Sequence, residues 1–286
     1  MSLLNPPLSF VIAGAHASLS FVDTCIFCTN PADSKEDLFP RWVLERVKTR
    51  ELLSRKVGDG AAELTEDQEV RIPCVCEKCN NGWMSRLEIK CKPMVGSLLE
   101  DVGFDLDIEH QKFLAEWALK MAMVNDAYEK HDRFFTDIER QAFKNDNRAI
   151  PAGTGVWAIR FDGRTLSSIG SIFELGLPNN NHLVEGHVYT VTVGHLSLQV
   201  LSLHEKADQG ITQVNVAASP LKWDEILIRL WPPPTNKKQT RRWPPKYSCA
   251  LVENLNFGNL HYGRLVNRFH TPDGHSININ NPLGDS

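Results

Sequence analysis

The sequence of 286 residues contains no run of 18 apolar residues, so no segment predicts a membrane-spanning helix. It has no Lys or Arg before Lys35, which leaves the apolar stretch at residues 8–19 without the positive flank of a secretory signal. The G-x-x-x-x-G-K-[ST] phosphate loop and the G-x-S-x-G nucleophile elbow are also missing, so those two chemistries have no support. We expect a cytoplasmic protein with no membrane partner.

An excess of positive charge is missing as well. The chain has 31 Lys and Arg against 35 Asp and Glu, which gives a net charge of −4. This balance excludes a globally basic nucleic-acid-binding protein, so any contact with nucleic acid must come from a local patch. The hydrophobic fraction of 42% and the charged fraction of 23% are typical of a globular chain with a sizeable core.

Cysteine is present in an unusual distribution. Six of the seven cysteines lie between Cys25 and Cys91, and this clustering favours metal thiolates in a reducing compartment over a disulfide scaffold. Two C-x-x-C pairs stand out, Cys25 with Cys28 and Cys76 with Cys79. Two intervening residues let both sulfurs of a pair reach one ion, and four thiolates form a closed tetrahedral zinc site. The spacing predicts structural Zn²⁺, although Cys74 is an alternative to Cys76.

The spacing of apolar and turn residues predicts an α+β chain. Expected helices cover 40–55, 80–89 and most of 107–144, where 136–143 forms a second helix; 57–68 is an expected loop. Expected strands cover 69–74, 155–161, 187–193 and 196–203, and 223–231 is a short helix or strand. We therefore predict a small zinc module at 1–95, then a long helix and a β-rich antiparallel domain within 96–286, whose role the sequence does not indicate.

The residues around the cysteine pairs carry a family resemblance. The first pair is followed by SKEDLFPRW at 34–42, and the second continues as CNNGWMSRLE at 79–88. This arrangement, over about residues 21–92, resembles the HNH (ββα-metal) endonucleases in their zinc-stapled form, which implies a ββα, treble-clef-like module. The resemblance further implies metal-dependent hydrolysis of phosphodiester bonds with Mg²⁺, Mn²⁺ or Ni²⁺. DNA is the expected substrate, RNA stays open, and phage defence is a common setting by analogy only.

The resemblance also assigns candidate catalytic residues. Glu36 matches the acidic metal-binding position, and Asn80 matches the metal-binding residue that opens the helix. Asp37 stands where the family places its general-base histidine, and Arg71 stands near the position of a central asparagine. With an ordinary pKa near 3.9, an aspartate is a weak base at neutral pH.

Three interpretations of Asp37 follow. It is a second carboxylate ligand beside Glu36, it marks a lost active site, or it is a residue changed to disable cleavage. A distant histidine such as His110 or His131 that folds back toward the zinc module is a further candidate for the general base. A catalytically inactive module that binds nucleic acid or protein is therefore the main alternative to an endonuclease, and a purely structural zinc protein is the third hypothesis.

Basic residues supply candidates for nucleic-acid contact. Arg41 begins a helix rich in Arg and Lys, and a denser basic run near the C-terminus is interleaved with aromatic residues. That run includes Lys237, Lys238, Arg241 and Arg242. Basic and aromatic residues together suit phosphate pairing and base stacking. The alternatives are a solvated helix face and a mobile loop, and a homo-oligomer is left open.

Overall fold

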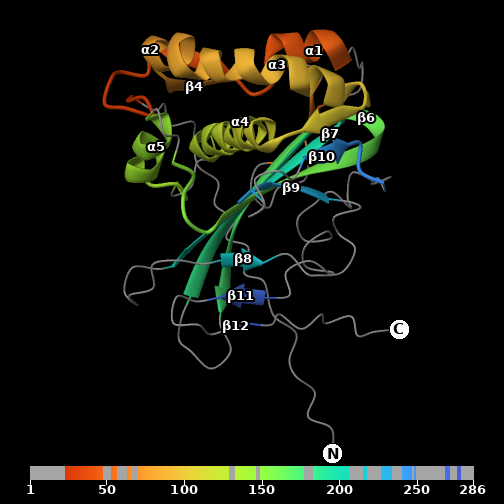
Figure 1. Ribbon diagram of the computed structural model, residues 1–286. Coiled ribbons are helices and arrows are strands. Elements are labelled where there is room, and N and C mark those ends of the chain that lie inside the picture. The colour runs from red at the N-terminus through yellow and green to blue at the C-terminus, as the bar shows by residue number, and fades with distance from the viewer. Residues whose placement is uncertain are drawn as a thin grey trace, which may run out of the picture.

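The structure of the protein is a computed structural model (Figure 1). The structure describes residues 23–47, 53–56, 63–65, 70–128, 133–145, 149–176, 183–205, 215–217, 227–233, 240–246, 248, 268–270 and 276–277. Predictions for 8–19, Lys237, Lys238 and His131 lie outside these residues. No helix within the described ranges is both long and apolar enough to cross a membrane.

Two helical layers lie on one side of a strongly curved sheet (Figure 1). The helices are α1 (Arg41–Val47), α2 (Glu77–Cys79), the π-helical segment η1 (Asn80–Met84), α3 (Ser85–Leu99), α4 (Ile108–Tyr128) and α5 (Asp137–Lys144). The segments α2, η1 and α3 follow one another directly, with a kink at Gly82. The predicted helices at 80–89 and 136–143 are thus confirmed, and the first extends to Leu99. Within the helical region predicted at 107–144, α4 covers Ile108–Tyr128.

The strands form four sheets among the described residues. Their bounds are β1 (Ser34–Asp37), β2 (Leu53–Lys56), β3 (Glu63–Thr65), β4 (Arg71–Val75), β5 (Phe104–Leu106), β6 (Thr154–Gly176), β7 (Leu183–Glu205), β8 (Asn215–Ala217), β9 (Leu227–Trp231), β10 (Arg241–Trp243), β11 (Arg268–His270) and β12 (Ser276–Ile277). The largest sheet has the order β3-β2-β6-β7, and β9 also pairs with β6. The other sheets are β1-β4, β5-β10 and β8-β11-β12. The predicted α+β class and the antiparallel second half are confirmed.

The predicted helix at 40–55 is wrong at its C-terminal end, residues 53–55. Helix α1 ends at Val47, and residues 53–56 form β2. This strand pairs in parallel with β6 and antiparallel with β3, which itself lies inside the predicted loop at 57–68. The apolar spacing suited a helix locally, but pairing with a strand more than 100 residues away in sequence decides the conformation, because tertiary context overrides weak propensities.

The hairpin of β6 and β7 folds back on itself. His187 and His204 both stack on Phe134, with ring centroids 5.5 and 4.0 Å away, although they lie seventeen positions apart on one strand. At about 3.3 Å per residue an extended strand would separate them by more than 50 Å. The ladder is irregular between Arg160 and Thr165, opposite Gly194 at φ +57°. A Cβ at Gly194 would lie 2.8 Å from the Leu99 carbonyl oxygen, so the corner needs glycine.

One hydrophobic core joins the two halves of the chain. Its members come from the cysteine-bearing segments, from α1, α3 and α4, and from β6, β7, β9 and β10. The predicted domain boundary between residues 95 and 96 falls inside α3. Helix α4 contacts α3, β4, β6, β7 and β9, so it lies between the cysteine-bearing part and the sheet. This central position makes α4 the element that connects the two parts.

A buried polar cluster ties α4, α5 and β7 together. The Asp126 carboxylate accepts hydrogen bonds from the Phe134 and Phe135 amides at 3.0 and 3.2 Å, and it pairs with the fully buried Arg140. His187 packs against both phenylalanines and is fully buried. Neither of its ring nitrogens has a hydrogen-bond partner within the described part of the chain. Burial therefore lowers the pKa of His187 to about 4, with Arg140 and His204 adding to the effect and Asp126 opposing it.

This low pKa predicts that His187 makes stability depend on pH. Between pH 6.5 and pH 4 the unfolded chain binds a proton at this histidine that the folded chain does not. Stability should therefore fall as the pH drops through that window, by about 2 kcal/mol at pH 5. His187→Phe should flatten the curve of unfolding free energy against pH, measured by urea denaturation. His110→Phe, at a half-exposed site, is the control that should keep the wild-type slope; equal slopes for both variants would contradict the prediction.

Candidate metal centre and its surroundings

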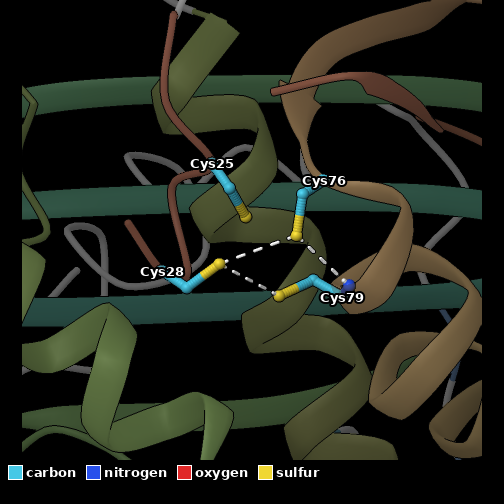
Figure 2. A group of neighbouring side chains, drawn as sticks. All are labelled: Cys25, Cys28, Cys76 and Cys79. Carbon is cyan, nitrogen blue, oxygen red and sulfur yellow. Dashed lines mark hydrogen bonds between the residues drawn. The ribbon is translucent and has the colours of Figure 1, made fainter. Parts of the chain in front are cut away.

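The two C-x-x-C pairs form two tight turns that face each other. In the first, the Cys28 amide donates to the Cys25 carbonyl at 3.1 Å. In the second, Cys76 is the N-cap of α2, and its sulfur accepts from the Cys79 amide at 3.4 Å. A backbone bond of 2.9 Å from Ile26 to the Cys74 carbonyl holds the two segments together. Figure 2 shows the four side chains converging on one point.

The spacing of the four sulfurs fits a tetrahedral metal ion. All four lie within 4.8 Å of one another, and Cys28 Sγ is 3.6 Å from Cys76 Sγ and 3.7 Å from Cys79 Sγ. Four sulfurs at about 2.3 Å from a zinc ion would be about 3.8 Å apart. The group can therefore hold a metal ion such as zinc. Among the described residues it is the only group of three or more His, Cys, Asp or Glu with such convergent ligand atoms.

The electrostatics of the four thiols favour a divalent cation at their centre. Burial and the neighbouring Cys25 raise the pKa of Cys79 well above its ordinary value. Burial would also raise the pKa of Cys76, but the Cys79 amide and the neighbouring thiols lower it to about 7. Four thiolates cannot share this space without a cation, because like charges oppose each other's ionisation. A bound Zn²⁺ would supply that charge and cross-link the two turns, and four protein ligands leave no open position for catalysis.

A buried ion-pair cluster lies beside the cysteines. Lys120 of α4 is fully buried, and its ammonium contacts Glu36 of β1 at 2.5 Å and Glu88 of α3 at 2.8 Å. Burial opposes the charge of Lys120, but the two carboxylates outweigh it and raise the pKa of Lys120 above its ordinary value. The predicted metal-binding acid Glu36 is itself 5% exposed and is held by this ammonium. A cation at Oε1 of Glu36 would have to displace Lys120.

The other two candidate catalytic residues also have partners. Asp37 lies opposite Arg71 in the β1–β4 register, and its Oδ1 is 3.2 Å from the Arg71 Nε. Asn80 donates its side-chain amide to Ser34 Oγ at 3.0 Å and to the Lys35 carbonyl at 2.9 Å. The amide of Asn80 therefore ties the start of the helix to β1. Each of the three candidates is therefore engaged by a protein group on or beside the β1–β4 pair.

The remaining predicted residues are placed as follows. Arg41 is exposed at the first position of α1, and Arg241 lies on β10. Arg242, also on β10, pairs with Asp105 of β5 at 2.7 Å. His110 lies ten positions before Lys120 on α4, about 15 Å along the helix, and contacts Asp107 instead of the Glu36 cluster. The alternative ligand Cys74 is fully buried outside the four-sulfur group, and burial raises its pKa to about 12.

Sequence reasoning missed the role of Lys120. The apolar stripe of α4 includes Trp117, Met121 and Val124, and Lys120 lies on the same buried helix between them. A lysine among buried positions must find a counter-ion, because isolated buried charge is too costly. A charged lysine among the apolar positions of a helix can be noticed in the sequence, but it does not identify Glu36 and Glu88 as the partners.

Comparisons with known proteins add no relative. No protein-family model matches the chain, and neither the curated proteins nor the solved structures include a significant match.

Proposed function

We propose that this protein binds nucleic acid through a zinc-stapled, HNH-like module that does not cleave its ligand. Support for the module comes from chain order: the antiparallel pair β1–β4 leads directly into α2, η1 and α3, and the four cysteines join the two segments. This order is the one expected of a ββα-metal module with a zinc staple. The loss of cleavage is argued from the partners of its three candidate catalytic residues.

The observation that carries the proposal is the pairing of Asp37 with Arg71. These two residues are the two departures from the HNH pattern, one replacing the general-base histidine and the other a central asparagine. They lie opposite each other on adjacent strands and form an ion pair. A carboxylate held by a guanidinium is a poor acceptor for a proton from water. The paired change favours a remodelled site over a single residue altered to disable cleavage.

The metal position gives the second line of support. Hydrolysis in the HNH manner needs an acid that is open to a divalent cation. Glu36 is instead buried and bound by Lys120, and the Asn80 amide is bound to β1. The Lys120 ammonium thus takes the place beside Glu36 where a catalytic cation would have to sit. An active endonuclease would require Lys120 to leave this position when metal and substrate bind.

A nicking assay tests the proposal. Supercoiled plasmid is incubated with the wild-type protein, Asp37→His, and Asp37→His/Arg71→Asn, each with Mg²⁺, Mn²⁺ or Ni²⁺. We expect the wild type to shift the plasmid in a gel without nicking it. Cys76→Ser, purified in the same way, controls for contaminating nuclease.

The assay separates the proposal from the endonuclease hypothesis. Nicking by the wild type that Asp37→Ala abolishes would overturn the proposal and make Asp37 a working residue. Nicking gained only by the double variant would support the argument from Asp37 and Arg71, and it would overturn the argument that Lys120 blocks the metal position. Failure of the wild type to bind any nucleic acid would overturn it in favour of a structural zinc protein.

A further inference from the structure

The outer face of α3 has a one-sided distribution of charge. The helix carries Arg86, Lys90 and Lys92 and a single acid, Glu88. Glu88 points inward to Lys120, whereas the three cations are exposed. None of the three forms an ion pair within the described part of the chain. A local positive face therefore exists on a protein whose net charge is −4.

The geometry of the helix places these cations around one convex surface. On a helical projection at 100° per residue, Arg86 and Ile89 lie in the middle of the exposed arc, with Lys90 and Lys92 at its two edges. Ile89 is 67% exposed, which marks the crest of this surface. Helices α1 and α3 form the outermost helical layer of the molecule (Figure 1). The surface is open to a large partner.

Lys90 and Lys92, at the two edges of this surface, each contact an aromatic ring of a neighbouring helix. The Lys90 ammonium lies 4.6 Å from the ring centre of Phe113 on α4, and the Lys92 ammonium lies 5.7 Å from the ring of Trp42 on α1. Such cation–π contacts keep the charged ends in place and lower the entropy lost on binding a phosphate. Each ammonium lies over one face of its ring, and both rings are partly buried, so little ring surface is open for stacking a base. The surface suits phosphates on the outside of a duplex better than the bases of a single strand.

We infer that the exposed face of α3, formed by Arg86, Lys90 and Lys92, binds the phosphate backbone of double-stranded DNA without reading its sequence. The inference rests on the proposed function and names the surface that would carry it. The surface lies on another element than the C-terminal basic run taken from the sequence, of which Arg242 is paired with Asp105. Arg41, the exposed sequence neighbour of Trp42, lies beside the same surface.

The test is a salt titration of binding to a fluorescent duplex of arbitrary sequence, followed by anisotropy between 50 and 200 mM salt. It compares the wild type with Arg86→Gln/Lys90→Gln/Lys92→Gln. The matched control is Lys144→Gln/Arg164→Gln/Lys246→Gln, which removes the same charge from other elements. Circular dichroism and metal content verify that each variant is folded. The α3 variant should bind about tenfold more weakly or worse, and the slope of log K against log salt should become shallower by about 2 to 3.

Each outcome bears on a separate claim. Loss of affinity and slope in the α3 variant alone would support this surface. Wild-type affinity and slope in the folded α3 variant would overturn it while leaving the proposed function intact. Tighter binding of the wild type to a single strand of the same sequence would overturn the duplex assignment. No binding by the wild type to either form would overturn both this inference and the proposed function.

Discussion

Replacing Cys76 with serine is expected to remove the metal ion and unfold the N-terminal part of the protein. The thiolate of Cys76 is one of four convergent ligands, and its sulfur also receives the Cys79 amide and the Asn30 side chain. A serine hydroxyl stays protonated and is a poor zinc ligand. Structural zinc contributes on the order of 10 kcal/mol in small zinc domains, which is comparable to the whole stability of a typical domain.

Metal content and thermal melting measure this effect together. The wild type should carry one zinc ion per chain, and Cys76→Ser should carry far less and melt at a much lower temperature. Cys91→Ser is the matched control, because Cys91 is equally buried but lies outside the group and donates its thiol to the Phe113 carbonyl at 3.4 Å. Full zinc content and an unchanged melting temperature in Cys76→Ser would show that the four thiols do not form the metal site.

Lys120→Met should destabilise the protein by about 3 to 5 kcal/mol. The substitution keeps much of the volume of the side chain but removes the ammonium that lies between Glu36 and Glu88. Two carboxylates would then face each other without a counter-ion, one of them almost fully buried. Breaking a buried ion pair by removing one partner leaves the other charge unpaired, and this costs far more than the net value of the pair.

Chemical denaturation measures the change, and two further variants test its cause. Lys144→Met removes a partly exposed lysine at the end of α5 and should change stability by less than about 1 kcal/mol. Lys120→Met/Glu36→Gln/Glu88→Gln removes the stranded charges and should recover part of the loss. A small effect of Lys120→Met, or no recovery in the triple variant, would contradict the account of Lys120 as the shared counter-ion.

Cys76→Ser and Lys120→Met also test how the cysteine-bearing part is connected to the rest of the chain. Lys120 comes from α4, whereas Glu36 and Glu88 come from the cysteine-bearing part. The hydrophobic core is continuous across the same junction. Loss of either the metal ion or the ammonium is therefore expected to loosen the packing of α4 as well as the cysteine-bearing part.

The sequence alone determined the features that depend on local spacing. Two C-x-x-C turns predict the four convergent sulfurs, because two residues between the cysteines place both sulfurs of a pair on one side of a turn. The helical period of α4 and the alternation in parts of β6 and β7 are likewise set by nearby residues. Strands were predicted at 155–161, 187–193 and 196–203, but the rest of β6 and the continuity of β7 were not predicted. The start of α5 at Thr136 follows from its capping box with Glu139.

The tertiary structure alone decided the features that depend on distant partners. Residues 53–56 became a strand because β6 offers a parallel edge, and the corner at Gly194 formed because the ladder folds back against the Leu99 carbonyl. The pairing of Asp37 with Arg71 depends on strand register, and the partners of Lys120 depend on how α4 lies across β1 and α3. Local propensity carries no information on register or on the packing of distant elements. These contacts between distant residues are the ones that decide how the candidate catalytic residues are engaged.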